Sequence, residues 1–185
     1  YKLGAFTASS SSMVTTTSGR PDTYWAATGT AEIKEVNGNQ VLSLSGTSTL
    51  TNSKVVEKIT AGDYYAKQQA WEVTVNLPSG NYGDVKLLSC GGTDGGIKIS
   101  GGKVYYDQGG TYQELSGVSL AAGKYIIKRE VDFRTDGKFT STYTISDANG
   151  KRLGGTSAVA MVAVTIPVTT LTISTTGATA AVEVD

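Results

Sequence analysis

The sequence contains no histidine among its 185 residues. This absence excludes a Ser-His-Asp triad, a Cys-His pair, and any zinc or copper site that has histidine ligands. A general base working near neutral pH would have to be a carboxylate, a lysine or a tyrosine with a shifted pKa. Most hydrolases and many lyases are therefore excluded.

Cysteine is almost absent, since Cys90 is the single one in the chain. One cysteine excludes an internal disulfide. Cys90 ends the apolar stretch that begins at Val85. We expect this stretch to be a strand in which Cys90 packs as a small hydrophobic residue, without a reactive role.

An excess of charge of either sign is also absent. The 16 basic and 16 acidic residues give a formal net charge of zero and are scattered singly. No basic stripe is available to neutralise phosphates, so the sequence predicts no nucleic-acid partner and no binding to an anionic membrane surface. No apolar run is long enough to span a bilayer, and the longest, Ala158–Val164, has the length of a buried strand.

The composition favours an extracellular protein. Thr, Ser, Gly and Tyr are frequent and Lys and Glu are few, a bias that resembles bacterial adhesins and carbohydrate-binding modules. The sequence begins at Tyr1 without a methionine or signal peptide, which indicates a mature or excised segment. We expect a secreted or cell-surface protein of one domain over residues 1–185.

The pattern of apolar residues predicts an all-β fold. Within Gln69–Leu77, the odd-numbered residues from Trp71 onward are apolar and the even ones polar, as in a half-buried strand. Asn37-Gly38-Asn39 is a typical hairpin turn. The nearest helix candidate, Lys54–Trp71, is interrupted by Gly62. About a dozen strands at hairpin spacing predict an antiparallel two-sheet sandwich of the jelly-roll type.

The ten tyrosines are the best candidates for a binding site. Sugar rings present apolar C–H faces that stack on aromatic planes, while their hydroxyls bond to amides and carboxylates. Several tyrosines fall in loops or at strand ends beside such groups. At most half of them are expected to face a ligand, because neighbouring residues of a strand point to opposite faces. The predicted ligand-binding residues are Tyr64, Tyr65, Gln68, Tyr82, Tyr105, Asp107 and Tyr112.

Two carboxylates could also carry chemistry. Glu130 and Asp132 are two apart and would share one face of a strand, where a glycosidase could use such a pair. The alternative interpretation is a solvated face on which Lys128, Glu130 and Asp132 form weak surface pairs, and we favour it. Structural calcium is a further alternative, with Asp22, Glu32 and Asp185 as candidate ligands. No other cofactor or metal is expected.

Three stretches resemble the concanavalin A-like (laminin G-like) lectin/glucanase superfamily. They are Thr23–Leu42, Ala122–Asp147 and Val182–Asp185, which are similar in order to the entry strand, central hairpin and closing strand of that family. Glu130-Val131-Asp132 resembles its catalytic Glu-x-Asp strand, but Arg134 and Thr135 stand where the acid/base Glu belongs. The alginate-lyase branch uses a Gln-x-His motif that a chain without histidine cannot form. The resemblance implies two curved sheets with a saccharide on the concave face or loop rim.

These observations together predict a non-catalytic carbohydrate-binding module that recognises a plant or algal polysaccharide. Binding would combine tyrosine stacking with hydrogen bonds from polar side chains. The module would belong to a larger multi-domain extracellular enzyme, of the kind that bacteria secrete. The alternatives are a structural or adhesive β-sandwich of a bacterial extracellular protein, and a glycosidase or polysaccharide lyase that uses tyrosine and carboxylates.

Overall fold

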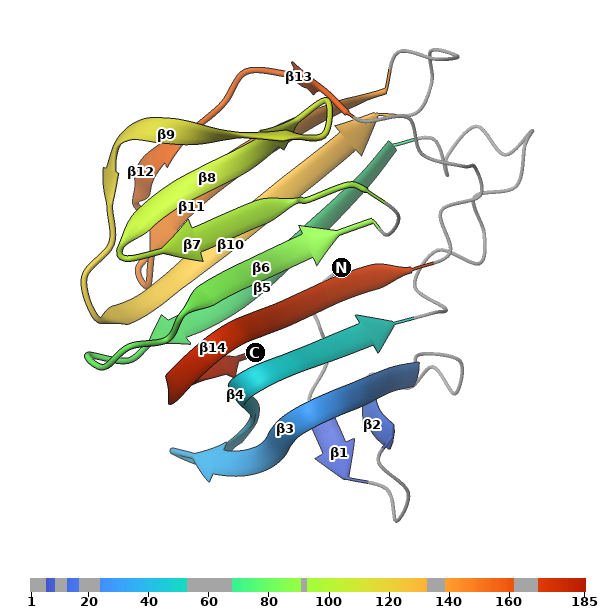
Figure 1. Cartoon of the computed structure of the whole chain (residues 1–185), viewed down its shortest axis with the longest axis vertical. Coiled ribbons are helices and arrows are strands. Elements are labelled where there is room, and N and C mark those ends of the chain that lie inside the picture. The colour runs from blue at the N-terminus through green and yellow to red at the C-terminus, as the bar shows by residue number, and fades with distance from the viewer. Residues whose placement is uncertain are drawn as a thin grey trace.

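A computed structural model describes residues 6–8, 13–16, 24–52, 68–90, 93–132, 139–161 and 170–185. This part of the chain is built of strands without a helix, and all their pairings are antiparallel (Figure 1). It therefore also holds no helix that is long and apolar enough to span a membrane. The strands are β1 (Phe6–Ala8), β2 (Met13–Thr16), β3 (Tyr24–Val36), β4 (Asn39–Asn52), β5 (Gln68–Leu77), β6 (Asp84–Ser89), β7 (Ile97–Ser100), β8 (Lys103–Gln108), β9 (Thr111–Ser119), β10 (Gly123–Asp132), β11 (Thr140–Asp147), β12 (Arg152–Gly155), β13 (Val159–Ala160) and β14 (Leu171–Val184).

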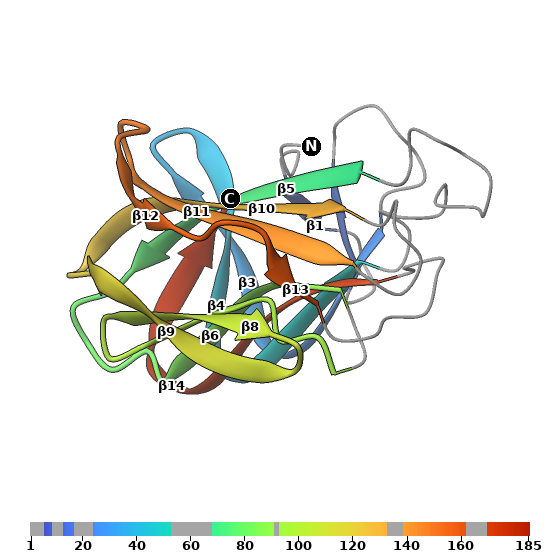
Figure 2. The ribbon, with the colours of Figure 1, turned by 90° about the horizontal axis from the view of Figure 1, so that it is seen from above.

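The sheet divides into two branches at β14. The first part of β14 pairs with β6, which continues through β7 and β8 to β9 and forms the near branch. The end of β14 pairs with β5, which continues through β10 and β11 to β12 and forms the far branch. The near branch lies in front of the far branch in Figure 1, and Figure 2 shows them on opposite sides of the molecule.

Hydrogen bonds join the described strands into one 14-stranded sheet that folds over itself. The all-β, antiparallel part of the prediction is confirmed. The predicted division into two separate sheets is not shown, because β14 pairs with β6 of the near branch and β5 of the far branch and so joins both branches into one hydrogen-bonded sheet. Strand lengths of 13 and 14 residues exceed those that the local sequence pattern predicts.

The pairing of β3 with β4 is interrupted by a bulge at Gly29. The pairing of β3 with β4 shifts register between Thr28 and Thr30, where Gly29 has φ +80°. Side chains are strained at such an angle, and a Cβ at Gly29 would also lie 2.4 Å from the carbonyl oxygen of Thr47. The buried Ser48 hydroxyl accepts a hydrogen bond from the Thr30 amide at 2.9 Å, which closes the bulge.

The core lies between the two branches and follows the predicted alternation. In β5, Trp71, Val73, Val75 and Leu77 are at most 2% exposed, so the assignment of Trp71 to the core is confirmed. On the opposite branch, Ile97 and Ile99 of β7 are likewise buried in the core. Each such side chain contributes about 1.5–3 kcal/mol when it is fully buried.

The predicted hairpin turn at Asn37-Gly38-Asn39 is present. Asn37 and Gly38 have φ of 53° and 81°, as a two-residue hairpin turn requires, and Val36 lies directly opposite Asn39. The helix candidate Lys54–Trp71, apart from its last residues, lies outside the described residues, and so do residues 162–164 of the predicted strand Ala158–Val164. Of the last segment, only Val159–Ala160 is seen in a strand.

The register of β10 can be tested with two neighbouring isoleucines. Ile127 is fully buried, whereas Ile126 is partly exposed on the opposite face. We expect Ile127→Ala to lower the free energy of unfolding by about 2–5 kcal/mol, because it leaves a cavity. Ile126→Ala is the matched control and should cost less than half as much. Urea unfolding measures both, and equal losses would contradict the register.

Candidate functional site

A hollow of about 390 Å³ opens on the outer face of the near branch, beside Tyr112. We call it the tyrosine hollow. The loop after β6 and the turn between β8 and β9 form two of its sides, and β6 and β14 form the floor. Hydroxyls, a lysine, carboxylates and one aromatic ring therefore meet in a single depression. Its lining residues are Lys86, Ser89, Thr93, Asp94, Gly95, Asp107, Gly110, Tyr112, Thr172 and Ser174.

Two lysines and two tyrosines lie side by side at this hollow. Lys98 stands directly opposite Lys86 on one side and Tyr105 on the other. Its Nζ is 4.8 Å from the ring centre of Tyr105 and 4.6 Å from that of Tyr112. The Nζ of Lys86 is 5.8 Å from the Tyr112 ring. Contacts of a cation with an aromatic ring at exposed sites are worth about 0.5–1 kcal/mol.

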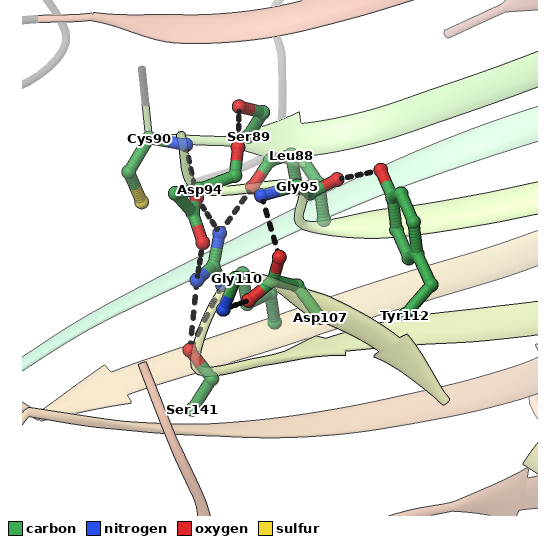
Figure 3. Close-up of polar contacts among 10 residues, drawn as sticks. Leu88, Ser89, Cys90, Asp94, Gly95, Asp107, Gly110, Tyr112 and Ser141 are labelled. Atoms are coloured by element: carbon green, nitrogen blue, oxygen red, sulfur yellow. Dashed lines mark hydrogen bonds and ion pairs between the residues drawn. The ribbon is translucent and has the colours of Figure 1, made fainter. Parts of the chain in front are cut away.

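The ring of Tyr112 is fixed by its hydroxyl (Figure 3). The hydroxyl donates to the carbonyl oxygen of Gly95 at 2.8 Å. Asp107 holds the same loop, since its carboxylate accepts from the amides of Gly95 at 3.2 Å and Gly110 at 2.9 Å. A Cβ at Gly95 would lie 2.7 Å from the Tyr112 oxygen, so only glycine lets the ring approach. Burial and then Asp107 raise the pKa of Tyr112, which keeps the donor protonated.

A buried ion pair lies beneath the hollow. The guanidinium of Arg129 in β10 donates to both carboxylate oxygens of Asp94, at 2.6 and 2.8 Å, and neither side chain is exposed. The remaining Arg129 donors reach the Leu88 carbonyl at 2.7 Å and the Ser141 hydroxyl at 3.0 and 2.9 Å. Asp94 also accepts from the amide of Cys90 at 2.6 Å. The loop of the near branch is thus held to the far branch by a satisfied pair (Figure 3).

Cys90 has no feature of a reactive thiol. It is 5% exposed, and its burial raises the pKa of the thiol to about 12. The thiolate is the nucleophilic form, so such a cysteine is inert at neutral pH. This agrees with the prediction that Cys90 packs as a small hydrophobic residue.

The structure brings together three of the predicted binding residues. Asp107 and Tyr112 line the tyrosine hollow, although Asp107 is only 3% exposed and holds the loop. Tyr105 is not part of the lining but shares the contact with Lys98 that Tyr112 makes. Tyr82 lies elsewhere, at a second hollow of about 440 Å³, where its hydroxyl accepts from the Gly102 amide at 2.8 Å. Gln68 is on the far branch. Tyr64 and Tyr65 lie outside the described residues.

Glu130 and Asp132 share the outer face of the far branch, as their spacing predicts. A hollow of about 380 Å³ lies beside them. Glu130 pairs with Lys128 at 3.0 Å, and Asp132 accepts from the Gln68 amide at 3.3 Å. These contacts match the interpretation as an exposed charged face. Arg134 and Thr135 lie outside the described residues.

The predicted calcium ligands do not meet in the part of the chain that can be described. Within these ranges no group of three cysteine or carboxylate side chains is close enough to hold a metal ion. Glu32 is exposed, with Lys34 at 4.0 Å, and the backbone of Asp185 pairs with that of Thr74. Asp22 lies outside the described residues, so calcium stays a prediction.

Sequence reasoning missed Lys86, Lys98 and Arg129. A signal for Arg129 was present, because it is in phase with Ile127 and Val131 on the apolar face of its strand. A charged residue in that phase indicates a buried partner. Lys98, between Ile97 and Ile99, is equally predictable as an outward residue. Its neighbours across the sheet are not, since they depend on which strands pair.

The ion pair can be tested by a double-mutant cycle. Arg129→Met leaves a buried carboxylate without its partner, and we expect a loss of about 3–5 kcal/mol in the free energy of unfolding. Arg152→Met on β12, where the arginine is exposed, is the control and should change stability by less than about 0.5 kcal/mol. The double variant Arg129→Met/Asp94→Asn should lose less free energy of unfolding than the sum of the losses of Arg129→Met and Asp94→Asn. Additive losses in urea unfolding would contradict the coupling.

The burial of Cys90 predicts a pH dependence. Its pKa of about 12 in the folded protein exceeds the ordinary value of 9.0, so the folded state holds the proton more tightly. The resulting stabilisation is complete below about pH 9 and is lost between about pH 9 and 12. Cys90→Ala should make the fall in stability over this window shallower.

The burial of Cys90 also predicts that the folded protein does not react with a disulfide reagent at pH 8. Rapid labelling of the thiol before urea is added would contradict the burial of Cys90.

No protein-family model matches the sequence. A search of curated proteins likewise finds no match. The similarities that do exist are to solved structures. At their low sequence identities they show the fold alone.

Several solved structures share the fold, and three of them illustrate the range. A protein of unknown function from Shewanella oneidensis has a TM-score of 0.58 at 17% identity, over 89% of this chain and 76% of that one. A carbohydrate esterase from a Shiga toxin-encoding bacteriophage has 0.53 at 13%, over 87% of each chain. The binding domain of botulinum neurotoxin DC, in complex with SialylT, has 0.53 at 8%, over 98% of this chain and 45% of that one. This chain therefore has the β fold of proteins that include carbohydrate-related ones.

Proposed function

We propose that this chain is a non-catalytic carbohydrate-binding module that binds polysaccharide at the tyrosine hollow. The observation that carries the proposal is the position of Tyr112. Its hydroxyl is bonded to Gly95, so the ring is held at the edge of a hollow lined by polar groups. A fixed aromatic plane beside hydrogen-bonding groups is what a sugar ring requires, because one of its faces is apolar and its rim is polar.

The polar lining supports this proposal. Ser174 and Thr172 on β14 supply hydroxyls, and Lys86 supplies a cationic donor. A hollow of about 390 Å³ has the volume of a small-ligand site. Because it lies on the outer face of a sheet, a longer chain could continue past the bound sugar unit.

The absence of catalysis is part of the proposal. No histidine exists in the sequence, and Glu130 is engaged with Lys128 on an exposed face. The carboxylates at the tyrosine hollow are likewise engaged in holding the loop. These observations favour binding over bond cleavage. A glycosidase or lyase at the Glu130 hollow is the second candidate, supported by the volume of that hollow and its two carboxylates.

The proposal extends to the fold family and to the larger protein to which this chain would belong. Two of the similar folds belong to carbohydrate-related proteins, the phage esterase and the toxin binding domain. We further propose that the fold is a concanavalin A-like jelly roll and that the chain is attached to a larger secreted or cell-surface bacterial protein. A weak single site would then gain avidity from its attachment.

The proposal is tested by affinity electrophoresis against a panel of plant and algal polysaccharides. We expect at least one of them to retard the protein. Tyr112→Ala should weaken that binding about tenfold, which corresponds to about 1.4 kcal/mol. Gln113→Ala is the matched control, because Gln113 is the next residue of β9 and is exposed on the other face.

Two outcomes would contradict the proposal. If no polysaccharide retards the protein, a structural or adhesive role is favoured instead. If reducing ends or unsaturated products are released from any polysaccharide, the chain is an enzyme. In that case Glu130→Gln should abolish the release.

A further inference from the structure

We propose that the tyrosine hollow selects anionic polysaccharides, whose carboxylate or sulfate groups are bound by Lys86 and Lys98. This inference rests on the sugar-binding function proposed above and adds the chemical class of the ligand. It is carried by the way in which charges are paired on this face of the near branch.

The acidic groups around the hollow already have partners. Asp94 is bound by Arg129, and Glu114 lies 3.2 Å from Lys103. Asp84 accepts from the Ser100 hydroxyl at 2.6 Å, and Asp107 accepts from two backbone amides. Each carboxylate is thus bound to a neighbouring group of the protein.

In contrast to these carboxylates, Lys86 and Lys98 form no ion pair with a described residue. Among the described residues, neither Lys86 nor Lys98 has a carboxylate oxygen within 4.0 Å of its ammonium group. They stand directly opposite each other on β6 and β7, and both ammonium groups lie near the Tyr112 ring. Like charges at opposite positions destabilise a sheet unless an anion is shared between them.

The position of the two ammonium groups suits a charged sugar. The Nζ atoms of Lys86 and Lys98 lie over the Tyr112 ring, 5.8 and 4.6 Å from its centre. A sugar that stacks on this ring would displace the two ammonium groups to its own edge, where its anionic substituents can bind them. A charged hydrogen bond is stronger than a neutral one. The carboxylates of Asp84 and Asp107 would repel a bound anion, but Asp84 is held by the Ser100 hydroxyl and the buried Asp107 by two backbone amides. Solvent and salt screen the remaining repulsion.

The same geometry has a purely structural interpretation. In that case the lysines pack on the tyrosines and contribute a little to stability, and no ligand is involved. The two interpretations differ in whether the removal of both charges weakens binding of an anionic polymer by a protein that stays folded.

The experiment uses two pairs of polymers that differ in charge alone. Polygalacturonate is compared with its fully methyl-esterified form, and dextran sulfate with dextran. The intact chain should bind the charged member of at least one pair about tenfold more tightly. A preference for polygalacturonate identifies a carboxylate ligand, and a preference for dextran sulfate identifies a sulfate ester. The tighter binding should weaken as salt concentration rises.

The matched variants are Lys86→Gln/Lys98→Gln and Lys124→Gln/Lys151→Gln. Both remove two charges, and the second pair lies away from the hollow on exposed positions. The first variant should lose about tenfold in affinity for the charged polymer, and the second should retain it. Both variants should stay folded without urea and unfold cooperatively in urea, so that lost binding is not lost folding.

The outcomes separate this inference from the function on which it rests. If the protein binds neutral and charged members equally, and Tyr112→Ala weakens the binding of both about tenfold, sugar binding stands and the selection of anions is wrong. If Lys86→Gln/Lys98→Gln binds the charged polymer as the wild type does, the selection is also wrong. If no polymer in either pair or in the wider panel is bound, both proposals fail.

Discussion

The ion pair between Arg129 and Asp94 is the interaction on which the arrangement of the candidate site depends. Both side chains are fully buried, and burial of two charges is costly unless every donor and acceptor is engaged. The guanidinium also reaches Leu88 and Ser141, and the carboxylate also reaches Cys90. Because Arg129 belongs to the far branch and Asp94 to a loop of the near branch, the pair fixes that loop to the core.

The loop that contains Asp94 in turn positions Tyr112 at the surface. Gly95 follows Asp94 directly, and its two backbone polar groups contact Asp107 and Tyr112. A buried electrostatic contact therefore determines where the aromatic ring at the hollow stands. An apolar pair of the same volume could fill the core equally well, but it would not place the Gly95 carbonyl with the same directionality.

Features that depend on neighbouring residues were predictable from the sequence, and features that depend on strand pairing were not. The Asn37-Gly38 turn follows from the φ angles that these residue types accept, and the burial of Trp71 follows from a period of two. The partners Arg129 and Asp94 are 35 residues apart, and the contact of Lys98 with Tyr112 requires that β7, β8 and β9 are adjacent. No local pattern contains that information. The sharing of β14 between the branches was missed for the same reason.

The position of β14 in the chain order has a consequence for how the protein folds. Its partners β4 and β6 precede it by more than 80 residues, as the pairs Thr172 with Thr51 and Thr172 with Ser89 indicate. Contacts of such long sequence separation slow folding, because the entropy of a large loop is lost before the pairing is gained. The strands of either branch can form hairpins early, but no backbone pairing joins the two branches until Leu171–Val184 pairs with β4 on one edge and with β6 and β5 on the other. We therefore expect β14 to pair late in folding. Until it does, β4, β5 and β6 expose unpaired edges that favour association with other chains.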